Sequence, residues 1–134
     1  MAILKHERIE LVTNEGVVTI RQRAREFALD ARLSLVDQTK LITAASELAR
    51  NMVVYGGGGV VILEHVEQDG RAGVRITFED KGPGIPDISL ALRDGYTTGG
   101  GLGLGLGGAK RLVNDFDLRS EAGQGTTIVI TRWK

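Results

Sequence analysis

One stretch of the sequence decides the fold, Val74–Gly84, which reads VRITFEDKGPG. Its first six residues alternate between apolar and polar side chains, so they predict a strand with one buried face and one wet face. The strand ends on Asp80, and Gly82 and Gly84 follow, where a flat ring could approach the backbone closely. A carboxylate in this place could accept a hydrogen bond from an amino group such as the adenine N6. Taken alone, the stretch fits an ordinary turn equally well, because Asp, Gly and Pro all favour turns.

Two helices are predicted upstream of this strand. A short strand at Arg8–Val12 is followed by a helix whose apolar residues recur at helical spacing. Ser34 and Asp37, three residues apart, resemble a capping box and open a second helix. This second helix is expected to run to about Tyr55, since Gly56 is a natural C-terminal stop.

The rest of the chain is predicted to add a partner strand, a helix and a closing hairpin. Val60–Glu67 should pair with the strand that ends at Asp80, through an Asp-Gly turn. A helix is expected at about Ala109–Asp115. The last two strands, Asp117–Glu121 and Thr126–Arg132, then form a hairpin.

Strands and helices occur in runs along this chain, not in strict alternation. This order predicts an α+β fold, a two-layer sandwich in which a mostly antiparallel sheet is packed on one side by helices. The length of 134 residues suits one domain, so residues 1–134 are expected to form a single domain.

The composition argues against several classes of protein. The chain has no cysteine, which rules out disulfides, thiolate metal sites and a cysteine nucleophile. Seventeen basic and seventeen acidic residues give a net charge of zero without a long basic run, so no nucleic acid partner is expected. No apolar stretch is long enough for a signal peptide or a membrane span, so we expect a cytoplasmic protein without a membrane partner.

The second predicted helix carries a polar pair, Glu47 and Asn51, four residues apart. With about 100° of rotation per residue, they lie about 40° apart on one helical face. A carboxylate and an amide oxygen there could serve magnesium, which prefers hard oxygen ligands. A carboxylate left free of the metal could instead accept a proton from an attacking hydroxyl. The alternative is that both residues belong to the solvated side of an amphipathic helix.

Glycine is concentrated in Gly99–Gly108, GGGLGLGLGG, out of nineteen glycines in the chain. The alternating leucines suggest a segment that folds onto apolar surface, and the glycines leave N–H groups free to cradle phosphates at the start of the next helix. Lys110 and Arg111 are expected in the first turn of that helix, where they could add charge or simply be solvated. The segment is not a Walker A loop, because the Gly-Lys-Ser/Thr ending is missing.

These motifs stand in a recognisable order: Glu-x-x-x-Asn on a helix, Asp-x-Gly-x-Gly after a strand, a long glycine segment, and Gly-x-Gly-Thr in the last hairpin. In this order the chain resembles the GHKL ATP-binding fold. The resemblance implies ATP held between helices and a mobile lid, with Asn51 on magnesium, Asp80 on adenine and Thr126 supporting the adenine end. The cofactor-binding residues that it implies are Asn51, Asp80, Gly82, Gly84, Gly101, Leu102, Gly103, Leu104, Gly105 and Thr126.

Within that fold the chain resembles the RsbT-type serine/threonine kinases over nearly its whole length. The matching stretches include Ser46–Asn51, Glu79–Asp87, Asp94–Gly103 and Lys110–Leu112. The resemblance implies that Glu47 is the general base and that the acceptor is a Ser or Thr of a STAS-domain protein. It also implies partner switching in stress signalling, as in a stressosome, with activation of a PP2C-type phosphatase.

Two other functions remain open on the sequence. An anti-sigma factor kinase, which binds a sigma factor directly, shares the same motifs. A non-catalytic module that binds nucleotide only to set its shape is the other alternative, although such a module has no need of a base such as Glu47. For the kinase, Glu47→Ala is expected to abolish phosphoryl transfer while nucleotide binding stays nearly intact.

Overall fold

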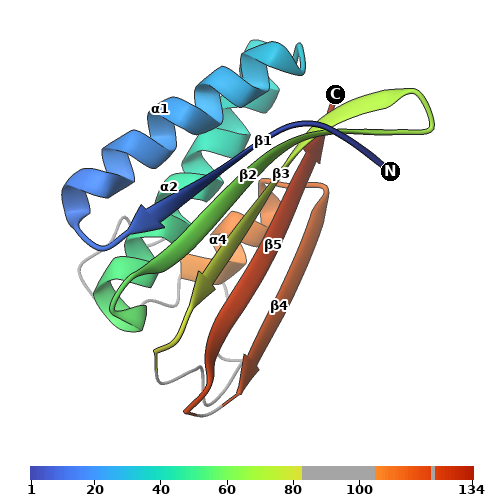
Figure 1. The fold of residues 1–134 in the computed structure, drawn as a ribbon. Helices are drawn as coiled ribbons and strands as arrows, with labels where there is room; N and C mark the ends of the chain where they lie inside the picture. Colours follow the sequence, from blue (N-terminus) through green and yellow to red (C-terminus); the bar gives the residue numbers. More distant parts are fainter. Residues whose placement is uncertain (83–104, 122) are drawn as a thin grey trace.

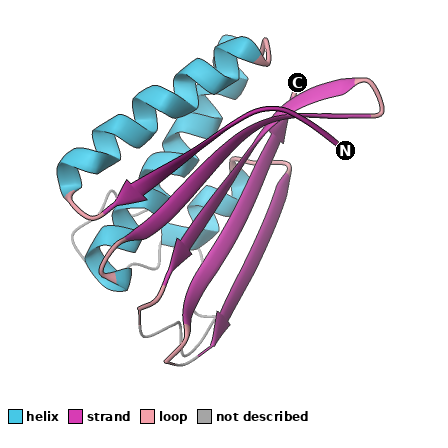
Figure 2. Cartoon of the chain, viewed as in Figure 1, coloured by secondary structure: helices cyan, strands magenta, loops and turns pink. Residues whose placement is uncertain are grey.

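The computed structural model describes residues 1–82, 105–121 and 123–134. In this part of the chain, five strands form one antiparallel sheet in the order β1-β2-β3-β5-β4, and three helices pack on one of its faces (Figures 1 and 2). The predicted α+β two-layer sandwich is therefore confirmed. The elements are β1 (Ala2–Leu11), α1 (Asn14–Asp30), α2 (Leu35–Gly56), β2 (Gly59–Gln68), β3 (Arg71–Asp80), α4 (Gly105–Arg111), β4 (Asp115–Glu121) and β5 (Gly125–Trp133).

The core lies between the helices and the sheet. Phe27 of α1 and Leu48 of α2 are almost fully buried there, opposite Leu63 of β2 and Ile76 of β3. Burying one such side chain contributes about 1.5–3 kcal/mol, so the helical layer is held mainly by this apolar contact.

The ends of α2 follow the predicted capping pattern. The Ser34 hydroxyl oxygen accepts a hydrogen bond from the backbone N–H of Asp37 at 3.1 Å, which satisfies one of the free N–H groups of the first turn. The helix ends at Gly56, and Gly57 takes a left-handed conformation with φ of 73°. Glycine is suited to that position because it has no Cβ to clash.

The β2–β3 hairpin also forms as predicted. Asp69 and Gly70 both have positive φ, 54° and 76°, as a two-residue turn of the I′ kind requires. The resulting register pairs Gly59 with Asp80, so this hairpin brings the end of β3 next to the residues that follow α2.

Two predicted boundaries differ from the structure. The first strand is longer than predicted, since β1 begins at Ala2 and pairs with β2 along most of its length. The helix predicted at Ala109–Asp115 was placed wrongly, because α4 spans Gly105–Arg111. The reason is strand pairing: the Asn114 N–H donates to the Thr131 carbonyl at 3.0 Å, and Asp115 already belongs to β4.

This shift also corrects the position of two basic residues. Lys110 and Arg111 lie in the last turn of α4, not in its first turn. Cations in a last turn face the negative end of the helix dipole, so these two residues are not placed to add positive charge at the helix start.

An ion pair joins the start of α2 to the last strand. The Arg132 guanidinium donates to Asp37 Oδ1 from Nη2 at 2.6 Å and from Nε at 3.2 Å, and Nη1 donates to the Leu112 carbonyl at 3.3 Å. The hydrogen bond from Arg132 is the main cause that lowers the pKa of Asp37, and partial burial opposes it. The Arg132 side chain therefore links β5 to the start of α2 and to Leu112, the residue that follows α4.

Candidate functional site

Asp80 and Thr126 lie side by side at one end of the sheet. They are register partners in the antiparallel β3–β5 ladder. The Asp80 carboxylate accepts a hydrogen bond from the backbone N–H of Gly82 at 2.9 Å through Oδ1. This hydrogen bond forms where the chain turns directly after β3, so the carboxylate lies at the end of the strand.

Glycine allows the backbone to come close to Asp80. A Cβ on Gly56, the last residue of α2, would lie 2.6 Å from the Asp80 carboxyl carbon. Gly125, at the start of β5, has φ of 93°, and a Cβ there would overlap the Asp80 carbonyl oxygen. The end of α2 and the last hairpin can therefore both pack against Asp80 only because these residues have no side chain.

Ser120 is a site residue that the sequence analysis missed. It is the register partner of Thr126, and their hydroxyl oxygens are 3.0 Å apart. The Ser120 hydroxyl also donates to the Gly125 carbonyl at 3.2 Å. Since a hydroxyl has one hydrogen, Thr126 then donates to Ser120 and keeps its own lone pairs as acceptors. Only the pairing of the two strands could have pointed to Ser120.

Glu47 is buried, with 4% of its surface exposed, so it does not belong to a solvated helix face. Its Oε1 accepts a hydrogen bond from the backbone N–H of Gly105, the first residue of α4, at 3.2 Å. Asn51 follows one turn later on α2 and is half-buried. A carboxylate with little access to water and an adjacent amide therefore lie on α2, whose last residue packs against Asp80.

The predicted residues therefore gather along the C-terminal half of α2. Asp80, Gly82 and Thr126 lie at its far end, and Glu47 with Gly105 lies where α4 packs on it. The other predicted site residues lie outside the described residues. They are Gly84, Gly101, Leu102, Gly103 and Leu104.

The described residues fit a magnesium ion that is held mainly by water and substrate. No group of three or more His, Cys, Asp or Glu able to hold a metal exists among residues 1–82, 105–121 and 123–134. A metal caged entirely by protein ligands is thus not provided by this part of the chain. Magnesium held by one amide oxygen, water and substrate phosphates needs no such cage.

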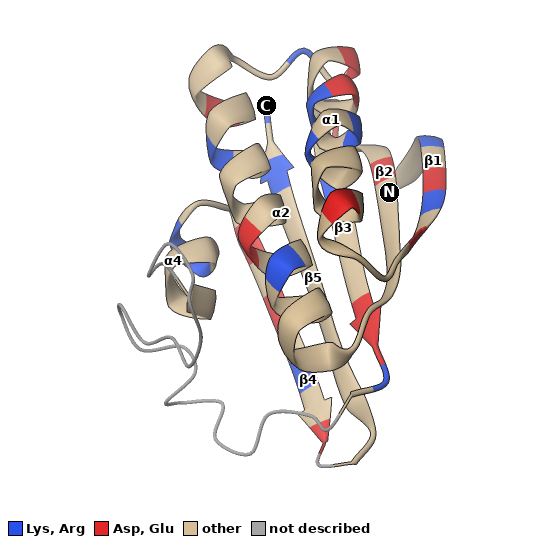
Figure 3. Cartoon of the chain, turned by 90° about the vertical axis from the view of Figure 1, so that its left-hand side faces the viewer, with Lys and Arg blue, Asp and Glu red and all other residues tan. Residues whose placement is uncertain are grey.

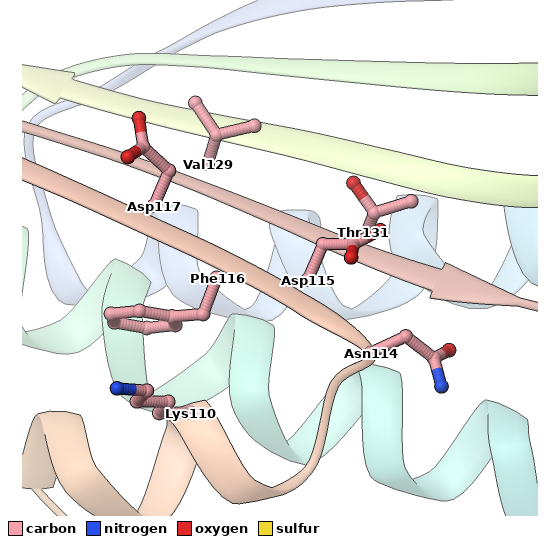
Figure 4. A pocket seen from close by; sticks show the side chains of 7 residues that line it. All are labelled: Lys110, Asn114, Asp115, Phe116, Asp117, Val129 and Thr131. Carbon is pink, nitrogen blue, oxygen red and sulfur yellow. The ribbon is translucent and has the colours of Figure 1, made fainter.

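A hollow of about 430 Å³ lies elsewhere, beside the edge strand β4 (Figure 4). Phe116 and Lys110 lie on one side of this strand, whereas Asp117 and Val129 lie on the other. No predicted site residue lines the hollow. The lining residues are Lys110, Asn114, Asp115, Phe116, Asp117, Val129 and Thr131.

Charges of both signs are interspersed over the helical face (Figure 3). Acidic and basic residues take turns along α2, whereas α1 carries three arginines, Arg21, Arg23 and Arg25, between Glu15 and Glu26. Both helices therefore carry charges of both signs. None of the helices in the described residues is long and apolar enough to cross a membrane.

Comparison of the sequence with known proteins identifies the family of this chain. The family described as histidine kinase-, DNA gyrase B- and HSP90-like ATPase matches residues 36–134. The chain is 45% identical over 125 residues to the serine/threonine-protein kinase RsbT of Bacillus subtilis (strain 168), which covers 93% of this chain and 94% of that protein. It is 28% identical over 126 residues to an anti-sigma F factor of Geobacillus kaustophilus, with 89% and 84% coverage.

Solved structures agree on the fold. The RsbU and RsbW domains of Rv1364c from Mycobacterium tuberculosis match with a TM-score of 0.68 and 24% identity, over 97% of this chain and 33% of that longer chain. The mycobacterial sensor histidine kinase MprB matches with a TM-score of 0.53 and 22% identity, over 96% of this chain and 97% of that one. At such identities the likeness concerns the fold.

Proposed function

Because this chain belongs to the histidine kinase-, DNA gyrase B- and HSP90-like ATPase family and is a homologue of the serine/threonine-protein kinase RsbT, we propose that it phosphorylates a STAS-domain partner from Mg-ATP. One observation carries the proposal. Glu47 is a buried carboxylate on the same helical face as Asn51, and the family to which the chain belongs is a family of ATPases. A protein that only holds nucleotide has no need of a general base in that place.

The adenine would be read at the end of β3. Asp80 would accept a hydrogen bond from the exocyclic amino group, while Gly82 would let the ring approach the backbone. Thr126 would support this end of the site through its free acceptor lone pairs, directly or through water. The packing of Gly56 against the Asp80 side chain and of Gly125 against the Asp80 backbone carbonyl supports this role, because both contacts restrict the position of Asp80.

Phosphoryl transfer would take place beside Glu47 and Asn51. The Asn51 amide oxygen would hold magnesium, which would supply positive charge to offset that of the phosphates. The substrate hydroxyl would attack the γ-phosphorus in line and lose its proton to Glu47, and ADP would leave. The backbone of residues 101–105 would wrap the phosphates, and Gly84 would line the base together with Gly82.

The proposed partner is a STAS-domain protein with a Ser or Thr acceptor. Release from that partner would let the kinase bind and activate a PP2C-type phosphatase, as part of partner switching in stress signalling. The identity to RsbT, 45% over nearly the whole chain, supports this reading over an anti-sigma factor kinase, for which the identity is 28%. We infer that residues 1–134 act as a single domain inside the cell.

The test starts with nucleotide and then adds the partner. Calorimetric titration of ADP and a non-hydrolysable ATP analogue with magnesium should show binding to the wild-type protein. Radiolabelled ATP should then label a purified STAS-domain protein from the same organism on Ser or Thr. Absence of nucleotide binding by a folded protein would refute the proposal. Retention of a sigma factor, with no labelled STAS protein, would favour the anti-sigma alternative.

A further inference from the structure

The beginning of α4 is tied to α2 by a buried polar contact. The Gly105 N–H donates to Glu47 Oε1 at 3.2 Å, and both residues are buried. Gly105 has φ of 61°, a left-handed conformation that suits glycine and few other residues. Backbone geometry at this residue therefore aims the N–H at the carboxylate.

The rest of α4 is attached mainly by apolar contact. Leu106 and Ala109 are buried against the core, and α4 packs chiefly on α2. Just beyond its end, the Leu112 carbonyl accepts a hydrogen bond from Arg132. A helix of only seven residues gains little stability from its own backbone hydrogen bonds. Its position therefore depends on these tertiary contacts.

We propose that Glu47 is also a positioning residue, whose hydrogen bond to Gly105 holds the start of α4 against α2. The carboxylate assigned as general base would thus serve two separable purposes. Its role in proton transfer rests on the proposed function, whereas its hold on α4 does not. A carboxylate has about four acceptor sites, so one hydrogen bond to Gly105 leaves capacity for a substrate proton.

This inference changes what the Glu47→Ala variant should do. The sequence alone predicts that this variant binds nucleotide nearly as well as the wild type. If Glu47 positions α4, the alanine variant also releases the Gly105 N–H and loosens the helix that follows the predicted phosphate-binding residues. Nucleotide affinity should then fall along with phosphoryl transfer.

Two substitutions at the same position separate the roles. Glu47→Gln keeps a side-chain oxygen that can accept from Gly105 but removes the base. Glu47→Ala removes both. Gln38→Ala is a matched control, because Gln38 is another buried polar residue of α2 whose hydrogen bond, 2.9 Å to the Leu33 carbonyl, has no connection to α4. Amide hydrogen exchange of residues 105–111 would be followed by NMR or by mass spectrometry, with the β2–β3 amides as an internal reference.

Exchange at residues 105–111 should become about tenfold to a hundredfold faster in Glu47→Ala, the range expected for one lost hydrogen bond to a charged group. It should stay within about threefold of the wild type in Glu47→Gln and in Gln38→Ala. Nucleotide affinity should follow the same order, whereas phosphoryl transfer should be lost in both Glu47 variants.

Equal exchange in the alanine and wild-type proteins would overturn the inference. Faster exchange across the β2–β3 amides as well would also overturn it, since Glu47 would then support the whole fold and not α4 in particular. A wild-type protein that fails to bind nucleotide would refute the proposed function alone, because the exchange measurement needs no nucleotide.

Discussion

Replacing Asp37 with Asn should destabilise the protein by about 2 kcal/mol at pH 7. Asp37 and Arg132 have only 21% and 16% of their side chains exposed, and two guanidinium nitrogens donate to one carboxylate oxygen. Hydrogen bonds to charged groups contribute about 1.5–3 kcal/mol when they are shielded from water. An unfolding entropy of about 2.1 cal/mol/K per residue gives about 280 cal/mol/K for 134 residues. The expected fall in Tm is therefore about 7 °C, measured by circular dichroism.

The loss of stability in Asp37→Asn should become smaller as the pH falls. The pKa of Asp37 in the folded protein lies below its ordinary value of 3.8, chiefly because of the hydrogen bond from Arg132. A lowered folded pKa means that the stabilisation is fully present above the unfolded pKa and is lost as the pH falls through the folded one. The Tm difference should hold from pH 7 to pH 5 and shrink below about pH 4.

Asp30→Asn is the matched control, since the Lys5–Asp30 ion pair is nearly half exposed on both sides. That variant should lose at most about a third as much Tm, as exposed pairs contribute little. An Asp37→Asn protein that melts within about 1 °C of the wild type at pH 7 would contradict our reading of the ion pair. So would a Tm difference that persists unchanged at pH 3.

Three further predictions concern the site and the core. Asp80→Asn should weaken nucleotide binding at least about tenfold in calorimetry, because an amide can turn its NH₂ toward the adenine amino group; unchanged affinity would place adenine elsewhere. Gly125→Ala should cost about 2 kcal/mol or more in chemical denaturation, since its Cβ would overlap the Asp80 carbonyl, whereas Gly123→Ala, with positive φ but open space, should cost only about 1 kcal/mol; equal losses would contradict the close approach. Phe27→Ala should cost about 3–5 kcal/mol in the same assay, and a loss below about 1 kcal/mol would mean that the buried ring is not a core residue.

Local signals predicted the parts of the fold that local chemistry controls. The Ser34 cap and the Asp69-Gly70 turn follow from the conformations that these residues favour. The position of α4 could not be read this way, because three of its seven residues are glycine and their intrinsic preference opposes a helix. Burial of Leu106 and pairing of Asp115 with β5 decide its limits, and both are tertiary effects.

The same distinction applies to the site. The motifs point to Asp80 and Thr126 separately, whereas their register depends on β3 and β5 being neighbours. The contact between Glu47 and Gly105 joins residues far apart in sequence, and the hydroxyl pair of Ser120 and Thr126 depends on exact strand register. Neither leaves a periodic trace in the sequence.

The strand order β1-β2-β3-β5-β4 has a consequence for how the protein folds. The hairpins β2–β3 and β4–β5 each close over a short turn, so they can form early from local encounters. The β3–β5 ladder joins strands that are not consecutive, and the entropy of closing the long intervening segment opposes it. That ladder holds Asp80 beside Thr126. We therefore expect the adenine end of the site to assemble late in folding, after the two local hairpins have formed.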